Sequence, residues 1–407
     1  MKSDRRYALF ILAAIFAVAH LDRHILSISL DAIGTEFTLS DTQLGMLSGL
    51  VFALVFAIAG FPIARLAARG SRRNIIAASA VVWSLLTIST SVAQNFLHLI
   101  IARLGVGIGE AGAVAPAHSM ISDLFPPERR TSALATFTSG ANVGVLLAFL
   151  IGGIVGQFLS WRWAFVIAGL PGLLLALLLR FAIKEPKRAL TNNTTPVYHS
   201  LFAATLNTIW NDRGLFHAMM GTALTGVVTF GALAWTPAFI ARAHGLNQAQ
   251  TGVFLALTMG VIGGLGTWYS GRLADRLGAG NPKWRIGMVI VAMLAAKPLV
   301  WGFLLLDNTT LALALYSVAI IAGAVFWGPT FAFLHSRVSN DMRPMATAIF
   351  LFAFNLVGVG IGPTLVGYAS SEIFAAAGTH SLGISMACMQ LVGLWGLWHY
   401  WQTMKTI

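Results

Sequence analysis

Residues 96–125 read FLHLIIARLGVGIGEAGAVAPAHSMISDLF, a run that is long and apolar enough to cross a bilayer. The run nevertheless carries Arg103 and Glu110, which are seven residues apart. Seven residues is close to two helical turns, so both side chains fall on nearly the same helix face. Charged groups in hydrocarbon are costly and are normally turned inward and paired. The pattern therefore predicts a functional site at this face, and a structural ion pair between helices is the alternative.

Glycine and proline in the same run predict close packing and a bend. The two charges are surrounded by glycines at positions 105, 107, 109 and 112. Glycines at this density let another helix or a ligand approach the backbone closely. Pro116 lacks a backbone donor, so we expect a kink near the middle of the span. A helix that serves only as an anchor needs none of these features.

The whole chain has the composition of a multi-pass membrane protein. Of its 407 residues, 57% are hydrophobic and only 10% are charged, and the mean hydropathy is +0.78. Soluble domains carry roughly 25% charged residues, so a soluble fold is excluded. The net charge of +12 does not indicate nucleic-acid binding, because the basic residues cluster in short segments between apolar runs. The one cysteine, Cys388, allows neither a disulfide framework nor a thiol metal site.

We expect an all-α membrane protein with twelve transmembrane helices. The apolar runs are continuous and do not alternate, which favours helices over a β-barrel. Each run is about 20 residues or longer, and the approximate cores are 7–30, 43–67, 74–94, 96–122, 132–158, 162–183, 214–241, 250–273, 285–306, 311–334, 345–370 and 382–402. Twelve spans put both termini on one side, and the Lys and Arg bias of the loops predicts that this side is cytoplasmic. The expected location is a bacterial-type inner (plasma) membrane.

The chain divides into two similar halves. We expect an N-terminal six-helix bundle over 1–183, a cytoplasmic linker over 184–212 and a C-terminal six-helix bundle over 213–407. The linker is the longest polar stretch of the sequence.

A repeated helix start supports a duplication. Ser40 with Gln43 recurs 207 residues later as Asn247 with Gln250, and both pairs predict a helix N-cap. Duplicated halves are typical of transporters, whose substrate site lies near the bilayer midplane between the repeats.

The sequence resembles a known family at several motifs. Residues 271–278, GRLADRLG, resemble the signature loop between the second and third helices of each half in the major facilitator superfamily. Within that superfamily the chain resembles the spinster-like branch, through LDR at 21–23, LSDTQLG at 39–45, PIAR at 62–65, SRRNI at 71–75, residues 103–112 and SMISDLFPPERR at 119–130. The cytoplasmic signature-loop residues are Arg65, Arg69, Arg72, Gly271, Asp275 and Arg276. One position departs from the pattern, because Ala68 stands where the family loop carries an aspartate.

The resemblance implies both a fold and a mechanism. The fold is two pseudo-symmetric six-helix bundles around a central cavity, working by alternating access. The activity is proton-linked movement of an amphiphile such as a lysophospholipid or a sphingolipid phosphate. By motif position Asp22 is the proton-titrating acid, with Arg103 and Glu110 as its partners facing the cavity.

The residues themselves are consistent with one charge cluster. Asp22 lies roughly 22 Å along its outward-running span, and Arg103 lies roughly 10 Å below the outer end of its inward-running span. These depths are similar, so Asp22 and Arg103 can meet. With Arg23 and Glu110 the set holds two acids and two bases and is formally neutral, which is how buried charge is tolerated. Protonating one acid would free a cation for an anionic headgroup, which would link a proton to an anionic substrate.

Other polar residues have less specific assignments. His20 and His24 lie one turn apart, where structural hydrogen bonding competes with pH sensing. Lys297 is either a snorkelling or locally paired lysine or a functional one. The cavity-lining candidates are Asn142, Thr225, Thr229, Tyr316 and Asn355, although asparagine serves equally as a hydrogen-bonding contact between helices.

The second half lacks counterparts of the buried acids. At the 207-residue shift Asp22 corresponds to Thr229 and Glu110 corresponds to Ser317. One wall of the cavity is therefore expected to be charged and the other mostly apolar, which suits a molecule with a headgroup and a tail.

We therefore expect a monomeric, proton-coupled secondary transporter of an anionic, lipid-like solute, whose partners are that solute, protons and the bilayer. An organic-anion symporter or a multidrug exporter of the same superfamily is the alternative, and a non-transporting receptor or scaffold is the alternative from another class. The sequence contains no P-loop, HExxH motif or Cys/His cluster. We accordingly expect no enzymatic activity, no cofactor and no metal.

Overall fold

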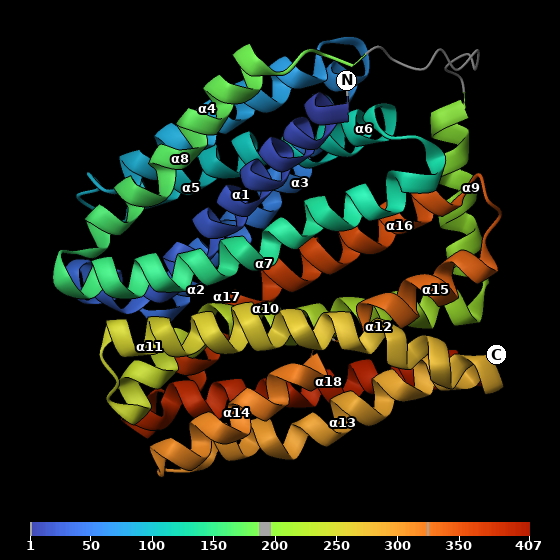
Figure 1. Cartoon of the computed structure of the whole chain (residues 1–407). Helices are drawn as coiled ribbons and strands as arrows, with labels where there is room; N and C mark the ends of the chain where they lie inside the picture. The colour runs from blue at the N-terminus through green and yellow to red at the C-terminus, as the bar shows by residue number, and fades with distance from the viewer. Residues whose placement is uncertain (1, 187–196, 324) are drawn as a thin grey trace. The chain divides into compact units, whose positions relative to one another are not determined.

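The computed structural model (Figure 1) describes residues 2–186, 197–323 and 325–407. Within these ranges the chain forms helices and no β-strand, which confirms the all-α prediction. The first half comprises α1 (Lys2–Phe37), α2 (Asp41–Ser48), α3 (Leu50–Arg69), α4 (Arg72–Thr90), α5 (Phe96–Ala111), α6 (Val114–Leu124), α7 (Pro127–Phe158) and α8 (Trp161–Ala182). The rest comprises α9 (Val197–Asn211), α10 (Arg213–His244), α11 (Gln248–Leu255), η1 (Ala256–Ile262), α12 (Gly263–Gly280), α13 (Lys283–Leu305), α14 (Thr309–Gly323), α15 (Trp327–Arg337), α16 (Arg343–Ala353), η2 (Phe354–Val359), α17 (Gly360–Tyr368), η3 (Ala369–Ile373), η4 (Ala375–His380) and α18 (Ser381–Lys405).

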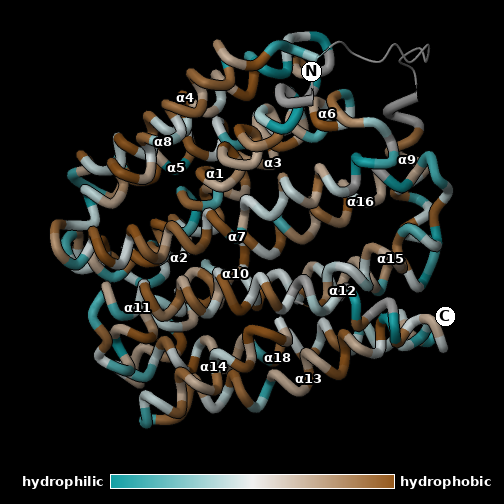
Figure 2. Tube along the Cα trace, in the orientation of Figure 1, coloured by the Kyte–Doolittle hydropathy of each residue, from teal (hydrophilic) through white to brown (hydrophobic). Residues whose placement is uncertain are grey.

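The number of membrane spans agrees with the sequence. Twelve helical stretches among the described residues are long and apolar enough to cross a membrane, which confirms the predicted count. Figure 2 shows hydrophobic residues along the helices and hydrophilic residues concentrated near helix ends. This is the distribution that a bilayer imposes, because only the interfacial ends of a span reach water.

The span at 96–125 is broken, as its proline predicts, but the break lies before the proline. Helix α5 ends at Ala111 and α6 begins at Val114. At the junction the amide of Ala113 bonds to the carbonyl of Glu110 at 3.2 Å, a tighter turn than the α-helix makes. Pro116 offers no N–H to the carbonyl four residues earlier, so the regular hydrogen-bond ladder is interrupted at this point.

Both predicted N-caps are present. The hydroxyl of Ser40 accepts a hydrogen bond from the backbone amide of Gln43, and the side-chain oxygen of Gln43 accepts one from the backbone amide of Ser40. Asn247 and Gln250 form the same pair of bonds. The two halves therefore begin corresponding helices with the same capping box.

The described helices form two compact units. Unit 1 is Met1–Thr191 with Ile240–Gly260, and unit 2 is Asn192–Phe239 with Val261–Ile407. This division differs from the expected halves at Ile240–Gly260, which packs with the first half of the chain. The reason is a close helix contact, since a Cβ on Gly252 of α11 would lie only 2.7 Å from the Cα of Gly153 of α7.

In unit 1 the packing brings α1, α4 and α5 around a common interior. Helix α1 packs mainly against α7 and α8, α4 packs against α8 and α5, and α3 packs against α5. Glycines allow the closest approaches, as the sequence predicts. A Cβ on Gly109 would lie 2.8 Å from the backbone nitrogen of Trp83, so α4 and α5 meet backbone to backbone at this level.

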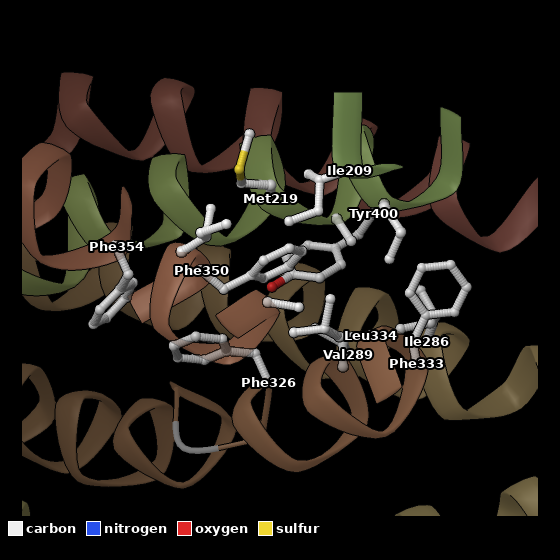
Figure 3. Packing of buried hydrophobic residues seen from close by; sticks show 14 of the residues in the cluster. Ile209, Met219, Ile286, Val289, Phe326, Phe333, Leu334, Phe350, Phe354 and Tyr400 are labelled. Carbon is white, nitrogen blue, oxygen red and sulfur yellow. The ribbon is translucent and has the colours of Figure 1, made fainter. Parts of the chain in front are cut away.

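In unit 2 a hydrophobic cluster is built around Tyr400 of α18 (Figure 3). The Tyr400 hydroxyl lies 3.2 Å from the Thr222 hydroxyl and 3.1 Å from the Thr330 hydroxyl, so its polar atom is satisfied inside the apolar core. Ile209 of α9 is fully buried in the same cluster. Helix α9 lies within the segment 184–212 that we expected to be a cytoplasmic linker.

Candidate functional site

Asp22 of α1 is fully buried and bonds to a residue that sequence reasoning missed. The hydroxyl of Thr87, on α4, donates to Oδ2 of Asp22 at 2.8 Å. The other carboxylate oxygen, Oδ1, has no hydrogen-bond partner among the described residues. The predicted direct pairing of Asp22 with Arg103 is absent from the described contacts, because Asp22 points toward α4.

The ion pair of the cluster joins the other two charged residues. Nε of Arg23 donates to Oε2 of Glu110 at 2.6 Å, across α1 and α5. The Glu110 side chain is 1% exposed and that of Arg23 is 19% exposed. Successive helical residues point about 100° apart, so Arg23 faces α5 while its neighbour Asp22 faces α4. Oε1 of Glu110 has no partner among the described residues.

Arg103 is buried, only 3% exposed, yet it forms no hydrogen bond or ion pair with any residue that the structure describes. Its guanidinium carbon lies 5.2 Å from the centre of the Phe52 ring, and the guanidinium carbon of Arg23 lies 4.9 Å from the same ring. Arg23 also lies 5.1 Å from the ring centre of Phe56. The aromatic faces supply part of the stabilisation that an unpaired buried cation needs.

The local fold of α5 explains how the cluster is assembled. A Cβ on Gly107 would lie 3.1 Å from the Phe52 carbonyl oxygen, and a Cβ on Gly105 would overlap a methyl carbon of Leu86. Because α5 lies this close to its neighbours, Arg103 reaches Phe52 of α3 and Glu110 reaches Arg23 of α1. The structure thus brings Arg23, Glu110 and Arg103 together beside Phe52, while Asp22, the neighbour of Arg23 on α1, bonds to Thr87. Phe52 and Thr87 were not predicted, since phenylalanine and threonine are common in membrane spans.

The five cavity-lining candidates lie in different environments. Asn142 of α7 and Thr229 of α10 are exposed, whereas Thr225 of α10 and Tyr316 of α14 are buried. The Asn355 amide in η2 donates to the carbonyl of Leu351 at 2.8 Å. Their role as cavity-lining residues stays a prediction.

The signature-loop residues divide into one buried arginine and several exposed ones. Arg72 is 2% exposed and donates to the carboxylate of Glu185 at 3.0 Å and to that of Asp123. It also donates to the Ser119 hydroxyl at 2.8 Å and to the Pro186 carbonyl at 3.0 Å, so it joins the start of α4 to the ends of α6 and α8. Exposed positions are occupied by Arg65, Arg69 and Arg276, while the side chains of Gly271, Asp275 and Ala68 lie outside the described residues.

The less specific charged residues have local partners. Lys297 of α13 is 5% exposed and donates to Oε1 of Gln390 at 2.9 Å, which matches the locally paired interpretation. Nδ1 of His20 lies 3.0 Å from the Phe16 carbonyl, and His24 stacks on Phe149 at 6.2 Å between ring centres.

The described residues contain no group of three or more His, Cys, Asp or Glu side chains placed to hold a metal ion.

Comparison with known proteins places this architecture in a family. The sequence model of the Major Facilitator Superfamily matches residues 12–363. The chain belongs to the Major Facilitator Superfamily. It is therefore a multi-pass membrane protein of a superfamily of transporters, as the signature loop indicates.

Named relatives place this facilitator near the spinster transporters. It is 30% identical to an "MFS-type efflux pump" of Mycolicibacterium smegmatis, over 95% of this chain and 90% of the relative. It is 26% identical to the "Sphingosine-1-phosphate transporter SPNS2" of Xenopus tropicalis, over 89% of this chain and 73% of the relative. The crystal structure of a bacterial homolog to human lysosomal transporter, Spinster, in an inward-facing and unoccupied conformation superposes with a TM-score of 0.90 at 27% identity, covering 100% of this chain and 98% of that one. The facilitator is thus related to the spinster family.

Proposed function

We propose that this facilitator is a proton-coupled secondary transporter of an anionic, lipid-like amphiphile. The observation that carries the proposal is Arg103, a buried cation without a hydrogen-bonding partner among the described residues, beside two buried carboxyl groups. A buried charge is costly unless it is paired, so a site with an unpaired arginine favours an anionic ligand. A guanidinium can grip a phosphate or carboxylate through two parallel hydrogen bonds.

The preference for an amphiphile rests on the contrast between the two halves of the sequence. Asp22 and Glu110 have no acidic counterparts at the corresponding positions of the second half, which are Thr229 and Ser317. Within unit 2, aromatic rings gather instead, with Trp327 stacked on Phe331 at 5.4 Å and packed edge-on to Phe354 at 4.5 Å between ring centres. Aromatic and aliphatic surfaces accept a hydrocarbon tail, whereas a sugar would leave its hydroxyls without partners there. One of the relatives is named a sphingosine-1-phosphate transporter, which is in keeping with this class.

Proton coupling rests on the arrangement of the carboxyl groups. Glu110 is the ion-pair partner of Arg23, and Asp22 lies next to Arg23 in sequence. Protonation of either acid leaves the cluster with an excess positive charge that an anionic headgroup can neutralise. The affinity for the substrate then depends on whether an acid carries a proton. Coupling requires such a difference in affinity.

An exporter of organic ions is the second candidate. The relative named as an efflux pump shares 30% identity with this chain over nearly all of its length, which favours that alternative. The same charge cluster would then act on drug-like anions.

Reconstitution into proteoliposomes tests the proposal. We expect a lysophospholipid and a sphingoid phosphate to accumulate when a proton gradient is imposed, and Arg103→Ala to lose both their binding and their transport. Arg180→Ala is the matched control, because Arg180 is exposed on α8, away from the cluster. Accumulation of dicarboxylates or drug-like anions in place of the lipids would favour the second candidate. Lipid flux that does not depend on the proton gradient would contradict proton coupling.

We further propose that both termini lie in the cytoplasm. The start of α13, directly after the short loop that follows α12, is basic, with Lys283 and Arg285, while Asp307 lies in the loop between α13 and α14. We expect a cysteine introduced at Gly280, in a Cys388→Ser background, to react only with reagents that enter the cytoplasm. A cysteine at Asp307 should react from outside, and the reverse result would invert the topology.

A further inference from the structure

Thr87 directs its hydroxyl differently from its neighbours on α4. The hydroxyls of Ser89 and Thr90 donate to the carbonyl of Leu86 within their own helix, at 2.8 and 3.1 Å. Such back-bonding is the usual way in which serine and threonine are satisfied in a helix. The hydroxyl of Thr87 instead crosses to α1 and donates to Oδ2 of Asp22 at 2.8 Å. Thr87 is 2% exposed, so water does not compete for this bond.

Asp22 depends on this one donor. Its carboxyl group is fully buried, and the Thr87 hydroxyl is its one hydrogen-bond partner among the described residues. The charged groups around Asp22 are Arg23 on its own helix and Arg103 and Glu110 on α5, while α7 and α8, which also pack on α1, add no charged side chain there among the described residues. None of the three forms a hydrogen bond to Asp22, so the hydroxyl acts on the carboxyl directly.

We propose that Thr87 is a positioning residue that fixes the Asp22 carboxyl group toward α4 and sets its affinity for the coupled proton. The proposal rests on the proposed function, in which Asp22 carries the proton. A hydroxyl that donates to a carboxylate stabilises the ionised form, because the neutral acid accepts a weaker bond. Thr87 thereby favours the ionised carboxylate, and it links the protonation of Asp22 on α1 to the position of α4.

Two substitutions separate the hydroxyl from the volume of the side chain. Thr87→Val keeps the branched shape and removes the donor, whereas Thr87→Ser keeps the donor. Thr90→Val is the matched control, since Thr90 is equally buried on the same helix but bonds only within it. All three are compared with wild type and with Asp22→Asn.

The first measurement is an infrared pH titration of the purified protein in lipid. The carbonyl band of protonated Asp22 is identified as the one missing from Asp22→Asn. We expect Thr87→Val to shift the midpoint of this band by about one pH unit to higher pH, a tenfold gain in proton affinity. Thr87→Ser and Thr90→Val should keep the wild-type midpoint. Because this titration needs no transport, it decides the proposal even if Thr87→Val carries no flux.

The second measurement is lysophospholipid accumulation driven by a proton gradient. We expect the pH dependence of Thr87→Val to shift in the same direction, and Asp22→Asn to lose accumulation. An unshifted midpoint in Thr87→Val, with accumulation lost in Asp22→Asn, overturns the role of Thr87 and leaves the proposed function standing. Accumulation by Asp22→Asn overturns the role of Asp22, and the role of Thr87 falls with it.

Discussion

Nε of Arg242 donates to Oδ1 of Asp31 at 2.6 Å, and the same guanidinium donates to both oxygens of Asp41 at 2.9 and 3.0 Å. Arg242 lies near the end of α10, in the segment Ile240–Gly260 that belongs to unit 1. One arginine from the second half of the sequence is thus held by two acids of the first half. If transport requires this segment to separate from α1 and α2, these bonds must break and re-form in each cycle.

Removing this arginine should loosen the segment. We expect Arg242→Ala to raise the labelling rate of a cysteine placed at Thr251 of α11, which is 1% exposed, by about 2- to 5-fold. The estimate is modest because the three side chains are partly exposed, and it should shrink further in high salt. Arg162→Ala serves as control, since it breaks an ion pair with Glu36 that lies within the first half. Equal labelling of the two variants would mean that helix packing alone holds the segment.

The buried carboxylate cluster was largely predictable, whereas its pairing was not. Arg103 and Glu110 stand out because charges are rare in membrane spans, and the capping pairs stand out because their spacing is specific. Which acid meets which arginine depends on how each helix is rotated about its axis, and that rotation is set by how the helices pack against one another. The α5–α4 contact at Gly109 is one such determinant, and no local pattern reports it.

Helix α9 was missed although a signal was present. Leu201, Thr205 and Ile209 follow one another at helical spacing, and Thr205 and Ile209 are buried. Polar residues before them dominated the composition of the segment. For the same reason the sequence indicated no role for Glu185, an isolated acid just after α8. In the structure Glu185 forms an ion pair with Arg72.

Glu185 gives a prediction about pH. Burial raises the pKa of its carboxyl group, but hydrogen bonds from the Arg73 amide, the Ser71 hydroxyl and the Arg72 guanidinium outweigh it and hold the pKa below its usual range. A group whose pKa is lower in the folded state stabilises the fold above its unfolded pKa, about 4.3 for glutamate, and that contribution disappears as the pH falls through the folded value. Glu185→Gln should lower the free energy of unfolding at pH 7 by about 1–2 kcal/mol.

Thermal unfolding between pH 7 and pH 3 checks this prediction. The Tm difference between wild type and Glu185→Gln should be largest at pH 7 and should close as the pH falls below about 4. Glu128→Gln, which changes an exposed acid of α7, should follow the wild type throughout. A difference that persists at pH 3 would show that the substitution acts through packing and not through the charge.

Gly109 should tolerate no side chain. A Cβ there would lie 2.8 Å from both the backbone nitrogen and the Cβ of Trp83, so Gly109→Ala must push α4 and α5 apart. We expect a loss of about 1–3 kcal/mol in stability and a fall in transport, because Glu110 moves with α5. Gly60→Ala, where nothing lies within 4 Å, should be neutral or slightly stabilising. Similar melting temperatures for the two variants would contradict the tight α4–α5 contact.

The ion pair between Arg23 and Glu110 leads to the last prediction, which separates coupling from binding. Glu110→Gln and Asp22→Asn imitate the protonated acids, so each leaves the two arginines with more positive charge than the remaining acids can neutralise. An anionic amphiphile should still bind, and the affinity of Glu110→Gln should equal or exceed that of wild type, because Arg23 no longer has its carboxylate partner.

Gradient-driven accumulation should nevertheless be lost in both variants, while exchange of labelled for unlabelled substrate continues. A group that cannot bind or release a proton has the same proton affinity, none, in both conformations of the transport cycle. The proton gradient therefore cannot drive the change between them. Binding and proton-driven flux are measured side by side, with Arg180→Ala as the control that should keep both. If the Asp22→Asn/Glu110→Gln double variant still accumulates a lysophospholipid against its gradient, these carboxylates only balance the charge of the arginines, and another group carries the proton.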